Sequence, residues 1–251
     1  MMNLLYIVGQ GSKRDNVELR WSLRSVERFG HGVGRVIVAG YPPEWLSGEV
    51  ERLPVPDVRA DGKNRSIVNC VVEAVLRADL RGDFAFAADD VFLYRPFDFE
   101  ALPRFVKDYD LPDGPKPGEL RTHFVQMLIE TRQFLRARGL PSVNFQTHAF
   151  VRMSADVIRE NEALLRSTVS DTVRGLEVLS LVGNLTLKAE PATRLVWRRD
   201  GKFGAEFPEC VGSRDDYGMF SISDATFGDG RFTSFMAANF GEPCRYERTE
   251  P

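Results

Sequence analysis

Two adjacent carboxylates, Asp89 and Asp90, interrupt the otherwise apolar stretch DFAFAADDVFLYRPF at residues 83–97. Acidic pairs are common at strand ends, where they serve turns and helix caps, so one interpretation is structural. The other interpretation follows from the cost of burial, because two like charges beside a core repel unless a cation, a proton or an arginine compensates them. A divalent cation is a natural partner for such a pair. The stretch therefore raises the hypothesis of a metal site.

The elements that must position this pair alternate between short apolar runs and helical patterns. Continuous apolar runs of this length are typical of strands buried on both faces of a parallel sheet. Asp15 is expected to cap the first helix and Gly30 to close it, which makes the first forty or so residues a βαβ unit. The expected strands are 3–9, 35–40, 50–55 and 84–88. The helices between them are 15–30 and one that Lys63 and Asn64 open and that ends near LRGD at 80–83. Asp89 and Asp90 then stand at the carboxyl end of a strand, where doubly wound sheets bind ligands.

Beyond residue 95 the pattern loosens. A loop rich in proline and glycine is expected at 109–118, followed by a helix over about 118–138 and by helices that start at Ser154 and Ser170. The tail mixes strand-like pieces at 193–198 and 217–223 with a short helix at 231–240. The sequence predicts an α/β fold with a mostly parallel sheet flanked by helices and an elaborated α+β C-terminal half, in a single domain with halves 1–97 and 98–251.

Composition narrows the class of protein. The chain has 251 residues, 43% of them hydrophobic, and a formal net charge of −3, which does not favour a general nucleic-acid binder. The basic stretch RLVWRRDGK at 194–202 is expected to be a solvated strand and turn. Three widely spaced cysteines indicate neither a zinc site nor a disulfide scaffold, and Cys70 is expected in the core. The first apolar run is too short for export or membrane spanning, so a soluble, cytoplasmic protein is expected.

A glycine-rich turn, VGQGS at residues 8–12, follows the first strand. It lacks the third glycine of a dinucleotide fingerprint, because Arg14 stands there, and no acidic residue closes the second strand. Gly9, Gly11 and Ser12 can bring backbone close to a ligand, or the glycines can simply permit a tight turn.

Lys63 and Asn64 open a helix in the same layer of loops. A helix N-terminus with a lysine is a favourable place for a phosphate, which is one interpretation. The alternative is that Asn64 or Ser66 caps the helix, and the two roles are compatible.

His148 and Asp224 complete the candidate residues. His148 lies in the run NFQTHAF and could join two aspartates in a mixed carboxylate and imidazole site, which suits manganese better than magnesium. His31 and His123 are expected to be structural or solvent-exposed. Asp224, in SRDDYGMFSISDATFGDG, is the candidate for a general base, although most acidic residues of that segment are expected in turns and caps.

Taken in order, these motifs resemble a known family. A parallel sheet that begins LLYIVG, a helix-opening Lys63 and Asn64 after the third strand, and the pair in FAFAADDVFL look like glycosyltransferases of the GT-A fold that use nucleotide sugars. The short motif DDVFL also resembles a motif of the Stealth-type sugar-phosphate transferases and of related short transferases of bacteria and their phages. The tail segments FSISDATF and NFGEPCRYE are similar to the ends of those short proteins, so the resemblance covers most of the chain.

This resemblance implies roles for the candidate residues. Asp90 would hold a divalent ion, Mn²⁺ or Mg²⁺, against the donor's diphosphate, and Asp89 would contact sugar or ribose. Ala88 stands where the family's first aspartate usually is. His148 resembles a histidine that follows the middle helices of the short transferases, with Phe150 in place of the usual proline. Residues 1–97 would be the nucleotide-sugar-binding half and 98–251 the acceptor-side half.

The resulting hypothesis is a metal-dependent glycosyltransferase that moves a sugar from a nucleotide diphosphate sugar, a uridine diphosphate sugar being the expected donor, to a hydroxyl acceptor. Negative charge builds on the departing diphosphate, which a bound ion stabilises. Two alternatives remain open, a sugar-1-phosphate transferase of Stealth type and a non-catalytic module that binds nucleotide or glycan. The acceptor stays open among glycans, proteins, small molecules and a modified DNA base.

Overall fold

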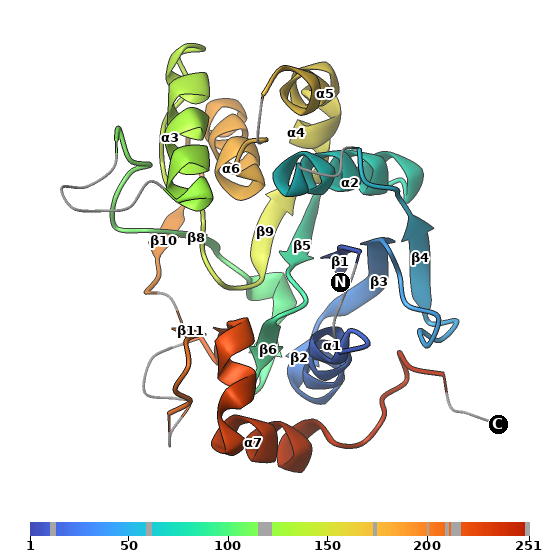
Figure 1. Ribbon diagram of the computed structural model, residues 1–251. Coiled ribbons are helices and arrows are strands. Elements are labelled where there is room, and N and C mark those ends of the chain that lie inside the picture. Colours follow the sequence, from blue (N-terminus) through green and yellow to red (C-terminus); the bar gives the residue numbers. More distant parts are fainter. Residues whose placement is uncertain are drawn as a thin grey trace.

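The computed structural model describes residues 1–10, 14–58, 62–114, 122–172, 175–199, 201–208, 211 and 217–248. Its central sheet has the strand order β4-β3-β1-β5-β9 (Figure 1). The first four of these strands pair in parallel and the last is antiparallel to β5. The bounds are β1 (Met2–Val8), β3 (Val33–Gly40), β4 (Val50–Pro54), β5 (Asp83–Ala87) and β9 (Val151–Ser154). The predicted mostly parallel sheet flanked by helices is confirmed at this level.

The sheet is buried on both faces, which explains why its strands read as continuous apolar runs. Leu4, Leu5 and Tyr6, successive residues of β1, all have no exposed surface. Leu5 belongs to the core beneath α2, whereas Leu4 and Tyr6 belong to the core beneath α1. Side chains that alternate across a strand thus supply two separate apolar layers.

Helices cover both faces. Figure 1 shows α2 and α3–α6 on one side of the sheet and α1 on the other, with α7 beyond α1. The bounds are α1 (Val17–Phe29), α2 (Lys63–Arg77), α3 (His123–Arg136), α4 (Ala155–Glu160), α5 (Glu162–Asp171), α6 (Val178–Ala189) and α7 (Gly230–Phe240). Cys70 of α2 is buried in the core, as predicted.

Two predicted helix starts are wrong. Asp15 does not cap α1, because Asn16 is the N-cap in a left-handed conformation, and Asp15 instead pairs with Arg20 at 3.1 Å. Ser170 does not start a helix but lies near the end of α5. The next helix, α6, begins at Val178, where the buried carboxylate of Glu177 accepts two backbone N–H bonds and so fixes the start.

The other expectations for the second half agree more closely with the structure. The Ser154 side chain caps α4, as expected, by accepting a bond from the backbone nitrogen of Val157. α3 begins at His123, and residues 118–121 of the predicted helix lie outside the described residues. The antiparallel strand β9 comes from this half and completes the sheet. A division of the chain near residue 97 stays a prediction.

Short strands build the rest of the fold. A second sheet has three strands, and its first strand in the chain, β6, follows β5. Its strands are β6 (Val91–Leu93), β12 (Met219–Ile222) and β11 (Lys202–Phe203). β8 (Arg104–Val106) pairs with β10 (Leu195–Trp197), and β2 (Gly30–His31) pairs with β7 (Phe97–Asp98). The described residues also include the 3₁₀ helices η1 (Phe99–Ala101) and η3 (Asp224–Gly228). In the described part of the chain, no helix is long and apolar enough to cross a membrane.

Candidate ligand site at the carboxyl edge of the sheet

The strand order reverses direction at β1, because β3 and β4 lie on one side of it and β5 and β9 on the other. In open α/β sheets, ligands bind in the crevice outside the carboxyl ends of the strands at such a reversal. Gly9 directly follows β1 here, and Asp89 and Asp90 follow β5 after Ala88. The sequence prediction that the carboxylate pair stands at this edge is confirmed.

Asp89 is held in an environment that opposes its charge. The pKa of its carboxyl is raised from 3.8 to about 6, first by burial and then by the neighbouring charges of Asp90 and Glu18, whereas Lys63 acts in the opposite direction. Its backbone lies in a tight turn in which the nitrogen of Val91 donates to the carbonyl of Ala88 at 3.4 Å. A plain turn residue would point to water and escape this cost, so the local fold keeps the charge close to the core.

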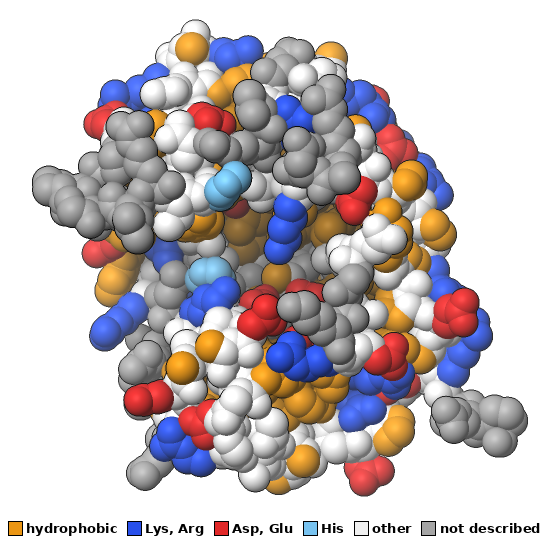
Figure 2. All heavy atoms as spheres, viewed as in Figure 1, with side chains coloured by type: hydrophobic (Ala, Val, Ile, Leu, Met, Phe, Trp, Pro, Cys, Tyr) orange, Lys and Arg blue, Asp and Glu red, His pale blue; other side chains and the backbone are white. Residues whose placement is uncertain are grey.

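Asp90 is also partly enclosed, with 26% of its side chain exposed. Burial raises its pKa, and the Lys202 ammonium, 3.7 Å from Oδ2, opposes that shift. The small sheet brings Lys202 there, because Lys202 pairs with Ser221, which in turn pairs with Val91. Figure 2 shows a hollow in this face of the molecule, with acidic and basic side chains gathered beside an apolar floor.

Lys63 and Asn64 open α2, as predicted. Lys63 is exposed at the first position of the helix, and its charge lowers the pKa of both Asp89 and Asp90, so it lies within electrostatic reach of the carboxylate pair. The proposed capping role of Asn64 or Ser66 is not found. Gly62 is the N-cap without a side-chain bond, and the hydroxyl of Ser66 instead accepts from the backbone nitrogen of Val58 at 3.3 Å.

His148 lies in the segment before β9. Because β9 runs antiparallel to β5 with Phe86 opposite Val151, the chain three residues earlier reaches the edge where β5 ends. The ring nitrogen Nε2 of His148 lies 3.4 Å from the side-chain nitrogen of Gln146. Among the described residues, no three His, Cys, Asp or Glu side chains are grouped closely enough to share a metal ion. A metal-ligand role for His148 stays a prediction.

Asp224 begins η3, just past the end of β12. The backbone nitrogen of Ile222 donates to the carbonyl of Asp90, so the chain leaving β12 emerges beside the carboxylate pair. The Asp224 side chain is 89% exposed and lies 3.6 Å from the Arg14 guanidinium. Its role as a general base stays a prediction.

The glycine-rich turn is described only in part. Gly9 is exposed, and a Cβ built on it would meet no atom of the described residues within 4 Å. Gly11 and Ser12 lie outside the described residues.

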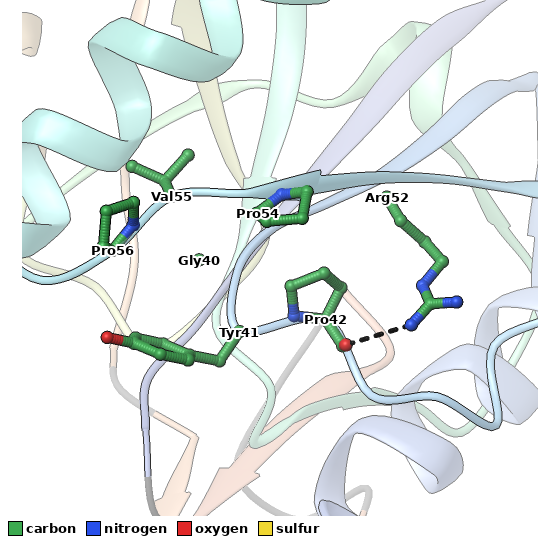
Figure 3. Close-up of a pocket in the computed structure, with 7 residues that line it drawn as sticks. All are labelled: Gly40, Tyr41, Pro42, Arg52, Pro54, Val55 and Pro56. Atoms are coloured by element: carbon green, nitrogen blue, oxygen red, sulfur yellow. Dashed lines mark hydrogen bonds between the residues drawn. The ribbon is translucent and has the colours of Figure 1, made fainter.

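A pocket of about 510 Å³ lies at the ends of β3 and β4 (Figure 3). Its lining is mainly the ring of Tyr41 and three prolines, with Arg52 donating to the carbonyl of Pro42 at 3.4 Å. The backbone nitrogen of Tyr41 donates to the carbonyl of Val8, the last residue of β1, so the pocket borders the same edge of the sheet. A mainly apolar lining with few polar groups suits an aromatic ring.

The donor set fits a divalent ion. Mg²⁺ and Mn²⁺ take carboxylate oxygens and are commonly held by one or two carboxylates together with substrate phosphates and water. Asp89 and Asp90 supply two carboxylates whose charges oppose each other and whose pKa values burial raises. A cation added between them would relieve that repulsion.

Comparison with known proteins adds nothing to these observations. No protein-family model matches the chain, and no match is found among curated proteins. The assignment of function below therefore depends on the site alone.

Sequence reasoning missed Lys202, which lies 112 positions after Asp90 in the chain. In the sequence it is only the end of the basic stretch 194–202. In the structure Arg194 and Arg199 of that stretch are exposed, whereas Arg198 is 2% exposed and donates to the backbone carbonyls of His148 and Met219. The signal for Lys202 is tertiary pairing across β11, β12 and β6, which no local motif encodes.

Proposed function

We propose that this protein is a metal-dependent glycosyltransferase that uses a nucleotide diphosphate sugar, with a uridine diphosphate sugar as the expected donor. One observation carries the proposal: a carboxylate pair with raised pKa values stands at the reversal point of the sheet and faces two lysines. Acidic and basic groups that converge in this way suit a ligand that combines a cation with phosphates. A site for a neutral ligand would not need both.

In this proposal Asp89 and Asp90 hold the divalent ion, which supplies electrostatic stabilisation to the diphosphate as it departs. Lys63, at the N-terminus of α2, and Lys202, on β11, approach the pair from different elements. Fixed positive groups of this kind stabilise negative charge where it develops, without reorganisation during the reaction. In the free protein Lys202 is paired with Asp90, and the phosphates become its new partners when the donor binds.

The pocket beside Tyr41 accommodates the base of the nucleotide. It borders the end of β1, and its volume of about 510 Å³ exceeds what a pyrimidine ring requires. The phenolic oxygen of Tyr41 accepts a bond from the backbone nitrogen of Asp57 at 3.2 Å, which fixes the ring in place. A fixed ring gives a stacking surface at little cost in side-chain entropy.

Asp224 is the proposed base for the acceptor hydroxyl, if the reaction inverts the anomeric centre. It is exposed at the rim, and Arg14 both pairs with it and stacks over Phe227 with its guanidinium carbon 4.0 Å from the ring centre. Release of Asp224 from Arg14 would be needed before it could accept a proton from an acceptor.

The direct test is to incubate the protein with nucleotide sugars and Mn²⁺ and to identify the phosphorus-containing products by ³¹P NMR. No acceptor is needed, because slow transfer of the sugar to water already shows which bond of the donor breaks. Release of a nucleoside diphosphate that requires Mn²⁺ and is lost in Asp90→Asn supports the proposal. Asp110→Asn, which changes an exposed aspartate, is the control. Release of a nucleoside monophosphate would identify a sugar-1-phosphate transferase instead. If the protein binds a nucleotide sugar but releases no product with any donor and any metal ion, it is a non-catalytic binding module.

A further inference from the structure

Arg65 carries a charge for which the described part of the chain supplies no partner. It lies in the first turn of α2 and is only 3% exposed. Within the described part of the chain, its buried Nε atom has no hydrogen-bond partner and no ion pair of Arg65 is found. A guanidinium removed from water without compensation is expensive, so its presence calls for a partner that the described residues do not provide.

Two glycines form a slot around the stem of this side chain. A Cβ on Gly62 would lie 2.9 Å from Cδ of Arg65, and one on Gly175 would lie 3.0 Å from its Cγ and 2.5 Å from its backbone nitrogen. Gly175 also has a φ of +80°, which favours glycine. The stem therefore passes back along the helix between two backbones, toward the N-terminus of α2, which is the direction in which helical side chains tilt.

The same end of the helix has further unmatched positive potential. α2 is 15 residues long, has no side-chain cap and has no acidic residue in its first turn. Its first N–H groups and the helix dipole favour an anion at this position. Lys63 stands on the same turn, where its charge acts on Asp89 and Asp90.

We propose that Arg65 and the N-terminus of α2 form an oxyanion-binding site for a phosphate group of the nucleotide ligand. The planar guanidinium presents donors in a fork that matches two phosphate oxygens, and the two glycines leave room for its stem beside the N-terminus of α2. The attribution to the nucleotide's phosphate rests on the function proposed above, whereas the anion site itself does not. Arg65 is therefore a binding residue, although it occupies a buried position of α2 where the sequence pattern predicts a core residue.

The test uses inorganic pyrophosphate and inorganic phosphate as probes, added to the whole protein without metal and followed by thermal unfolding and calorimetry. Arg65→Met keeps the aliphatic stem and removes the guanidinium. We expect it to weaken pyrophosphate binding at least tenfold while leaving the ligand-free melting temperature unchanged or higher, because an unpartnered buried charge has been removed. Arg77→Met, at the other end of the same helix, is the matched control and should bind as the wild type does.

Equal pyrophosphate binding by the wild type and Arg65→Met would overturn the proposal, and so would the absence of any binding by the wild type at millimolar pyrophosphate. Failure of Arg65→Met to fold would also count against it, because the guanidinium would then have a structural role. A fall in its ligand-free melting temperature has the same meaning. Arg65→Lys should restore the charge but recover only part of the affinity.

The two proposals fail separately. If the wild type binds pyrophosphate through Arg65 but binds no nucleotide in the presence of any metal ion, the anion site is supported and the glycosyltransferase function is refuted. If a uridine diphosphate binds with Mn²⁺ equally well to the wild type and to Arg65→Met, the function stands and the role of Arg65 falls. Comparison of phosphate with pyrophosphate shows whether one phosphate group is enough to occupy the site.

Discussion

Replacing Asp89 by asparagine should stabilise the ligand-free protein at neutral pH. The fold raises the pKa of this carboxyl from 3.8 to about 6, mainly through burial and then through the charge of Asp90. A shift of about two units corresponds to about 3 kcal/mol, since one unit is about 1.4 kcal/mol. That free energy opposes folding whenever Asp89 is ionised, and Asp89→Asn removes it while preserving the shape of the side chain.

The dependence on pH has a definite sign. The native protein binds the Asp89 proton more tightly than the unfolded chain does, so this group's contribution is most favourable below pH 3.8. It is lost as the pH rises through the folded-state pKa near 6 and is constant above that value. The advantage of Asp89→Asn should therefore be absent near pH 4, grow between pH 4 and 6.5, and reach about 3 kcal/mol at pH 7.5.

Urea unfolding of the wild type and of Asp89→Asn across that pH range measures the difference directly. A change of about 3 kcal/mol also corresponds to a rise in melting temperature of roughly 6–12 °C for a chain of this size. Asp110→Asn, at an exposed position, controls for the loss of one negative charge. A variant that is no more stable than the wild type at pH 7.5 would refute the reasoning, because the pair would then be an ordinary structural turn.

Three further changes test neighbouring parts of the account. Lys202→Met should raise the pKa of Asp90 further and weaken binding of a nucleoside diphosphate by about tenfold, which calorimetry would detect; unchanged affinity would remove Lys202 from the site. Glu247→Gln should cost about 3 kcal/mol in urea unfolding at pH 7, because burial opposes the ionisation of Glu247 but its arginine partners on α1 outweigh this and lower its pKa. The wild type's advantage should shrink as the pH falls below 4.5, and a loss that does not depend on pH would contradict the ion-pair explanation. Gly183→Ala should destabilise by about 1–3 kcal/mol despite the better helix propensity of alanine, because its Cβ would lie 2.5 Å from the ring of Phe145, and a rise in melting temperature would show that the ring can move.

The sheet could be predicted from the sequence because its strands are buried on both faces. Their apolar runs are continuous, and the helices between them carry a regular apolar face, so the βαβ order follows from local patterns. Asp89 and Asp90 could be placed at a strand end for the same reason. The antiparallel strand β9 was not foreseen, because its four residues follow a long irregular segment and take their direction from pairing with β5.

Helix ends were predicted less well where a side chain from outside the local pattern decides them. Ser170 has the right chemistry for a cap, yet α6 begins only after Glu177, whose buried carboxylate binds the first N–H groups. Glu177 could not be identified as a cap from the pattern alone, because a glutamate at this position usually points to solvent.

The other residues of the candidate site could not be predicted from the sequence for a related reason. Lys202 reaches Asp90 through two successive strand pairings, and Arg65 occupies a position on α2 where a core residue is expected. Asp224 lies near Arg14 only because β12 runs beside β6. Spacing along the chain cannot reveal contacts that depend on this second sheet.

The most direct test of the central claim is calorimetric titration of uridine diphosphate into the wild type and Asp90→Asn, with and without Mn²⁺. The account predicts binding to the wild type that is at least tenfold tighter with Mn²⁺ and a loss of this metal dependence in the variant. Should the wild type bind no nucleotide diphosphate under either condition, or bind it with an affinity that neither Mn²⁺ nor Asp90→Asn changes, the claim that the carboxylate pair is part of a metal and diphosphate site is contradicted.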